Sequence, residues 1–232
     1  GQSWDTHSIF TYGSIHSVHF LDDQIGWAVG SDGIIIKSTN GGEDWFSQTI
    51  GTNYSILSVC FLNNQIGWAT GELGTILKTT NGGETWFSQG DRRNNHLRSV
   101  FFIDNLVGWA VGNCGTILKT YNSGEYWFSQ NILSSDIFYS IKFVDIQIGW
   151  IAGWHGIIYK TTSGGEGWFA QSSNTNYDLN AIDFVNNNIG WAVGNEGTIL
   201  KTIDGGTSWF VQQSTINSNF KSVDFLDDQI GW

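Results

Sequence analysis

The chain has 232 residues, of which 40% are hydrophobic, and a formal net charge of −11 at neutral pH. That acidic balance argues against nucleic acid and anionic membrane surfaces as partners, because phosphate groups are bound by clustered Lys and Arg. No apolar run approaches the roughly 18 residues of a membrane-spanning helix, so no membrane span is expected. The two cysteines form no CxxC pair, which argues against both a disulfide and a zinc site.

Tryptophan recurs along the chain at a fixed interval, and the 41 residues from Trp27 to Trp68 separate every following pair. Gly-Trp pairs begin at positions 26, 67, 108, 149, 190 and 231, and a second Trp column stands at 4, 45, 86, 127, 168 and 209. Of the 13 tryptophans only Trp154 falls outside these two columns. A period near 40 residues is typical of repeat architectures such as propellers.

Within one repeat the residue pattern predicts four short strands. In the second repeat they are 58–61, 67–71, 75–79 and 86–89, with a two-residue turn at 72–73 and a tight Asn-Gly-Gly turn at 81–83. Helical periodicity is absent throughout. Four antiparallel strands per repeat predict an all-β protein built as a β-propeller.

We expect residues 1–232 to form a single propeller domain that is cut within a repeat at both ends and belongs to a longer chain. Six blades are the most economical count, because a strand at 4–10 could complete the blade begun by residues 221–232. Seven blades are the alternative. Tryptophans buried between blades would explain their periodicity, since one buried ring hides about 150–250 Å². We therefore predict burial for seven of them and exposure for Trp154. The seven are Trp68, Trp86, Trp109, Trp127, Trp150, Trp168 and Trp191.

The turn between the third and fourth strands, residues 38–45 in the first repeat, resembles the Asp-box or BNR repeat, Ser/Thr-x-Asp-x-Gly-x-Thr-Trp. Its acidic position is occupied by Asn40, Asn81, Asn122, Ser163 and Asp204. Because an amide can also close an Asx-type turn, the turn is expected in every repeat. Calcium is not expected there, since most of these turns offer one neutral oxygen.

The wider pattern GWAVGxxGTILKTTxGGxxW, clearest at 190–209, resembles the Ycf48-like branch of Asp-box propellers, the photosystem II stability and assembly factors. That resemblance covers the whole chain and implies seven blades. It also implies either a lumenal assembly factor of a photosynthetic organism or a module of a secreted bacterial protein. A basic patch for binding the reaction-centre protein would be part of the first role, whereas this chain is acidic.

Function is expected where the repeats differ, because binding residues concentrate on loops held by a rigid frame. The turns between second and third strands vary in sequence, as do the connections between blades, and in a propeller the two sets lie at one end. We name this end the variable face. Its candidate binding residues are Trp154, His155, Arg92, Arg93, Tyr54, Tyr177, Glu72 and Glu196.

Three functions remain open. The best supported is a non-catalytic extracytoplasmic module, secreted, cell-surface or periplasmic, that binds protein or glycan through the variable face. The second is a photosystem II assembly factor, in the thylakoid lumen if the source is photosynthetic. The third is a glycoside hydrolase, which needs two carboxylates about 5–10 Å apart. Glu72, Asp136, Asp178 and Glu196 could supply them, but no spacing singles out a pair. We expect no catalytic centre, no cofactor and no bound metal.

Overall fold

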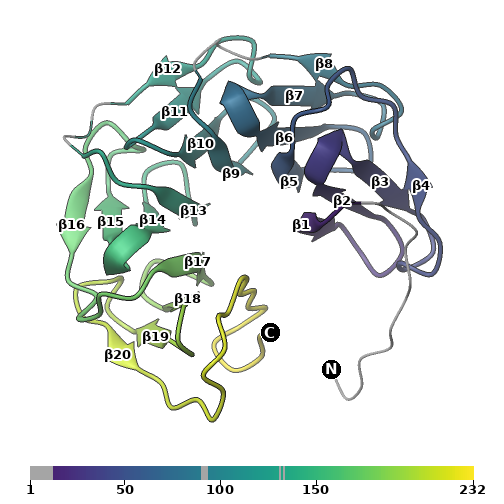
Figure 1. Ribbon diagram of the computed structural model, residues 1–232. Coiled ribbons are helices and arrows are strands. Elements are labelled where there is room, and N and C mark those ends of the chain that lie inside the picture. The colour runs from purple at the N-terminus through teal and green to yellow at the C-terminus, as the bar shows by residue number, and fades with distance from the viewer. Residues whose placement is uncertain (1–12, 90–93, 131, 133) are drawn as a thin grey trace. The chain divides into compact units, whose positions relative to one another are not determined.

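The computed structural model describes residues 13–89, 94–130, 132 and 134–232. Its residues group into two compact units, 1–97 and 98–232. The described part is all-β, as predicted, and consists of five sheets of four antiparallel strands. In each sheet the strands lie in chain order (Figure 1).

The first unit holds two of these sheets. One comprises β1 (Ile15–Phe20), β2 (Gly26–Gly30), β3 (Ile35–Ser38) and β4 (Phe46–Ser47), and the other β5 (Ile56–Phe61), β6 (Gly67–Gly71), β7 (Ile76–Thr79) and β8 (Phe87–Ser88). The Gly-Trp pair opens the second strand in each, as the sequence predicts. The fourth strand is the shortest in both sheets.

The second unit holds the other three sheets. They comprise β9 (Leu97–Phe102), β10 (Gly108–Gly112), β11 (Ile117–Thr120) and β12 (Phe128–Ser129); β13 (Phe138–Phe143), β14 (Gly149–Gly153), β15 (Ile158–Thr161) and β16 (Phe169–Gln171); and β17 (Leu179–Phe184), β18 (Gly190–Gly194), β19 (Ile199–Thr202) and β20 (Phe210–Val211). The only helical segments of the described chain are three-residue 3₁₀ turns: η1 (Ser31–Gly33), η2 (Glu72–Gly74) and η3 (Trp154–Gly156).

The described residues thus contain five complete sheets, where six blades were expected. Beyond β20 the pairing is reduced to one antiparallel bridge between Phe225 and Gly231. The residues expected to complete a sixth blade, 4–10, lie outside the described part of the chain. The total number of blades therefore stays a prediction, as does the single domain over 1–232.

The Gly-Trp pair is explained by packing between neighbouring sheets. Trp109 stacks on Phe143 of the next sheet, with ring centroids 3.6 Å apart. Its indole Nε1 donates to the backbone oxygen of Gly164, at 3.0 Å. Gly149 is required because a Cβ there would lie 2.6 Å from the Phe143 ring. Burying one such indole contributes about 4–6 kcal/mol as an upper bound, which accounts for the Trp period.

The predicted difference between the tryptophans is confirmed. The seven periodic rings named above are all buried, with at most 9% of their surface exposed. Trp154, in the turn η3, is 40% exposed. It is therefore available to a partner.

The Asp-box turns close as expected even where the acid is replaced. Asp204 Oδ1 accepts a hydrogen bond from the N–H of Ser208 at 2.9 Å. Asn81 Oδ1 accepts the equivalent hydrogen bond from the N–H of Thr85 at 3.0 Å. The hydroxyl oxygen of Ser163 accepts it from the N–H of Gly167 at 3.1 Å. One oxygen at this position is sufficient to close the turn.

Candidate functional site

The two variable loop sets meet in the second, fourth and fifth sheets, as the sequence predicts. The N–H of Trp154 donates to the backbone oxygen of Ile137 at 2.9 Å, and that of Asn195 to Asp178 at 2.9 Å. In the first unit Glu72 N donates to Ser55 O at 3.0 Å. These bonds fix each turn against the connection that precedes its blade.

A β-bulge lies at the second residue of the first strand of the sheets. The register between first and second strands shifts around His16, Leu57, Tyr139 and Asn180, and Arg98 is the equivalent residue of β9. Bulges re-aim a side chain and are frequent next to functional sites. These residues differ from repeat to repeat, although the two residues that follow them hardly change.

In the second unit the bulge residues join one polar cluster. Arg98 Nε donates to Asn113 Oδ1 at 2.6 Å, and its guanidinium carbon lies 5.3 Å from the centroid of the Tyr139 ring. No carboxylate of the described chain forms an ion pair with Arg98. Its terminal N–H groups can therefore bind an incoming acceptor.

Asp178 continues this cluster into the next sheet. Its carboxylate accepts hydrogen bonds from the N–H of His155 at 3.0 Å and from Asn195 Nδ2 at 3.3 Å. Asn195 in turn accepts from Asn180 Nδ2 at 3.0 Å. Burial raises the pKa of the Tyr139 hydroxyl, and Asp178 raises it further, while Arg98 acts in the opposite direction. We call Arg98, Tyr139, Asp178, Asn180 and Asn195 the bulge-face cluster.

The candidate residues of the turns lie around this cluster. Trp154 and His155 stack on each other, with ring centroids 3.8 Å apart, and His155 borders a hollow of about 330 Å³. Tyr177 and Glu196 line another hollow, of about 280 Å³. All four belong to the second unit.

Two of the remaining candidates belong to the first unit. In the first unit Tyr54 lines a hollow of about 440 Å³ with Leu73, and Glu72 Oε2 accepts a hydrogen bond from Ser55 N at 3.1 Å. Arg92 and Arg93 lie outside the described residues.

The second residue of the variable turn has the left-handed conformation in all five sheets. The residues with this positive φ, between 52° and 56°, are Asp32, Leu73, Cys114, His155 and Glu196. Such a conformation is uncommon for residues other than Gly, Asn and Asp. Because it recurs whatever the side chain, the frame imposes it, and it presents a different exposed side chain in each blade.

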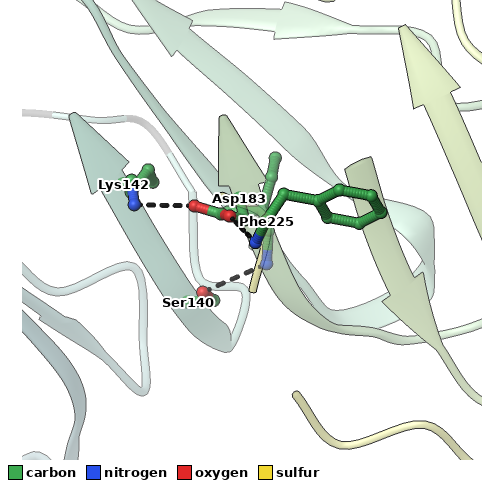
Figure 2. Close-up of polar contacts among 5 residues, drawn as sticks. Ser140, Lys142, Asp183 and Phe225 are labelled. Atoms are coloured by element: carbon green, nitrogen blue, oxygen red, sulfur yellow. Dashed lines mark hydrogen bonds and ion pairs between the residues drawn. The ribbon is translucent and has the colours of Figure 1, made fainter. Parts of the chain in front are cut away.

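A second variable position of the first strand, three residues after the bulge, links neighbouring sheets (Figure 2). Lys142 Nζ lies 2.6 Å from Asp183 Oδ1, and Asp183 Oδ2 accepts from the N–H of Phe225 at 2.7 Å. Ser140 Oγ makes another link between the same two sheets, because it accepts a hydrogen bond from Ile182 N at 3.2 Å. Because Asp183 is almost completely buried, this ion pair has a structural role.

Sequence reasoning missed both variable strand positions because it looked for differences only in loops. The sequence nevertheless shows variation at both positions. At the bulge position the repeats read His16, Leu57, Arg98, Tyr139 and Asn180, and three residues later His19, Cys60, Phe101, Lys142 and Asp183. The Ser and Val or Ile between these positions hardly change, so a comparison by repeat position would have found both.

The acids named for a two-carboxylate hydrolase are not paired by any contact in the described chain. Asp178 is occupied by the donors above, Asp136 bonds the hydroxyl of Ser134, and Glu72 bonds Ser55. No three or more His, Cys, Asp or Glu side chains of the described residues gather as a metal site. No described helix has the length and apolar character to cross a membrane.

Four-stranded antiparallel sheets with an Asp-box turn between the third and fourth strands, and with Trp packed between sheets, define the class of Asp-box β-propellers. The family model described as photosynthesis system II assembly factor YCF48 matches residues 1–92, 91–176 and 170–232. The chain belongs to this family. No curated protein matches the chain in sequence.

Solved structures of this family share the fold. A YCF48 structure bound to a D1 peptide is 20% identical, with a TM-score of 0.66, over 96% of this chain and 89% of that one. YCF48 from Cyanidioschyzon merolae is 17% identical, with a TM-score of 0.55, over 97% and 93%. A GH74 xyloglucanase from Xanthomonas campestris is 9% identical, with a TM-score of 0.76, over 94% of this chain but only 43% of the enzyme. At these identities the likeness concerns the fold alone.

Proposed function

We propose that this protein is a non-catalytic extracytoplasmic module that binds a peptide segment of a partner protein on its variable face. The observation that carries the proposal is the bulge-face cluster. It places an Arg98 side chain without a carboxylate partner beside Tyr139, and its Asp178 holds the turn of the exposed Trp154. Arg, Tyr and Trp are the residues that contribute most to binding energy in protein interfaces.

The cluster is suited to an extended peptide because its groups are already held in position. Arg98 is fixed by Asn113, and Asn180 bonds both Asn195 and the backbone oxygen of Phe220, the latter at 2.7 Å. Groups that need no reordering lose little conformational entropy on binding. Guanidinium and amide groups can then bond the backbone carbonyl and N–H groups of a peptide.

The comparisons support a peptide over a glycan. A related YCF48 was solved with a D1 peptide bound, and the family is described as an assembly factor of photosystem II. For this chain we extend that to peptide binding, with a reaction-centre protein in the thylakoid lumen as the partner if the source is photosynthetic. Hydrolysis has less support, because the GH74 likeness is one of fold and three of the four candidate acids, Asp178, Asp136 and Glu72, are engaged in loop contacts.

Selection from a random dodecamer peptide library, supplemented with D1 peptides, tests the proposal. We expect enriched peptides to lose about tenfold in affinity with Arg98→Ala. The matched control is His16→Ala, the bulge residue of β1, which should change affinity less than about twofold. Failure to enrich any peptide, or equal affinity of the two variants, would contradict the proposal. Thermal melts of both variants establish that they fold.

A further inference from the structure

The hollow beside Tyr177 and Glu196 combines an aromatic face with a free carboxylate. Tyr177 is 53% exposed and lines this hollow of about 280 Å³ together with Glu196. The rest of its lining is uncharged, and it includes Asn174, Thr198, Gln212 and Ile216. Glu196 is therefore the one ionised group of the hollow.

The backbone of Glu196 is held while its carboxylate is not. Its N–H donates to Asn219 Oδ1 at 3.1 Å, and its φ of 54° is set by the turn. No described residue forms a hydrogen bond or ion pair with the carboxylate. A fixed backbone with an unpartnered charged end is suited to receive a ligand of opposite charge.

The second sheet offers an internal comparison. Tyr54 stands at the same repeat position as Tyr177, and Leu73 at that of Glu196. Tyr54 and Leu73 also line a common hollow, of about 440 Å³. The aromatic residue is thus present in both the second and the fifth sheet, whereas of these two only the fifth has the carboxylate.

We propose that the hollow of Tyr177 and Glu196 binds a Lys or Arg side chain of the partner segment; this rests on the peptide-binding function proposed above. A cation over a Tyr ring is attracted by the ring quadrupole, and the carboxylate adds a charge-assisted hydrogen bond. The apolar stem of Lys or Arg can pack on Val211 and Ile216, which also line the hollow. The net charge of −11 attracts a basic segment to the surface.

The test uses acetylated tetraarginine amide and its tetracitrulline counterpart, which has nearly the same shape but no charge. Binding to the full chain is measured by calorimetry at physiological salt. We expect tetraarginine to bind at least about fivefold more tightly than tetracitrulline. Glu196→Gln should weaken tetraarginine binding about fivefold, and Tyr177→Ala about threefold.

Two matched variants separate this site from general charge attraction. Glu166→Gln removes the same charge from an exposed Asp-box turn, and Tyr54→Ala removes the equivalent ring of the second sheet. Each should change affinity less than about twofold. Equal losses with Glu196→Gln and Glu166→Gln would overturn the proposal, as would equal binding of the two probes.

The two proposals fail in different ways. If library peptides bind and depend on Arg98 but tetraarginine does not depend on Glu196, the cation site is wrong and the peptide-binding function stands. If no library peptide binds, the peptide-binding function itself is wrong.

Discussion

Lys142 Nζ lies 2.6 Å from Asp183 Oδ1, across the boundary between two neighbouring sheets. The second oxygen of Asp183 accepts from the N–H of Phe225 in the segment that follows β20. In the preceding sheet this kind of tie is made by the hydroxyl of Ser140, a position where the next repeat has Ala181. The buried carboxylate of Asp183, paired with Lys142, thus holds the C-terminal segment where the repeated hydroxyl is missing.

Replacing Asp183 should therefore destabilise the protein. Asp183→Ala leaves the Phe225 N–H and the Lys142 ammonium without their partner, and we expect a loss of about 2–4 kcal/mol in the free energy of unfolding. Asp183→Asn keeps an acceptor for Phe225 and should lose less. Urea denaturation of the two variants measures both values. An unchanged midpoint for Asp183→Ala would show that the tie contributes nothing.

The two kinds of tryptophan should respond differently to truncation. Trp109 is fully buried and stacked on Phe143, so Trp109→Ala should cost about 3–5 kcal/mol. Trp154 is partly exposed, and Trp154→Ala should cost less than about 1 kcal/mol. Thermal and urea unfolding compare them directly. Similar losses in the two variants would mean that the η3 turn depends on its Trp for packing.

Tyr139 of the bulge-face cluster should lose its proton at a higher pH than an ordinary tyrosine. Its pKa is raised first by burial and then by Asp178, so the folded state favours the neutral phenol. The resulting stability is present below the ordinary Tyr pKa of 10.0 and is lost as pH rises through the folded value. Carbon-13 NMR of Tyr139 across alkaline pH measures it. In Asp178→Asn the pKa should move down toward 10.0; an unmoved value would separate Tyr139 from Asp178.

The Asp-box acid should affect stability at low pH. The pKa of Asp204 is lowered, chiefly by the hydrogen bond from the N–H of Ser208. Its contribution is present above the ordinary value of 3.8 and is lost as pH falls through the folded pKa. Asp204→Asn should flatten the acid side of the stability profile, and Asn81→Asp should steepen it. Melting temperatures between about pH 2 and pH 6 check both signs.

The repeat made the scaffold predictable. Strand order, the Gly-Trp opening of the second strand and the Asp-box turn all follow from local patterns that occur in every repeat. Burial of the seven named tryptophans followed as well, because a large apolar ring in every blade is stable only when packed against the next one. The meeting of turn and connection also followed from the propeller class.

The sequence by itself thus determined the class of fold, the turn chemistry and the set of loops that vary. Only the tertiary structure decided which side chains act together. Arg98, Tyr139 and Asp178 belong to different repeats, and a β-bulge sets the direction of Tyr139, which strand alternation alone does not reveal. In the sequence, Asp183 likewise cannot be told from the other acidic residues. Only the folded chain places Lys142 and Phe225 beside it. Contacts between repeats depend on how the sheets pack, and that packing is a property of the folded chain rather than of any local pattern.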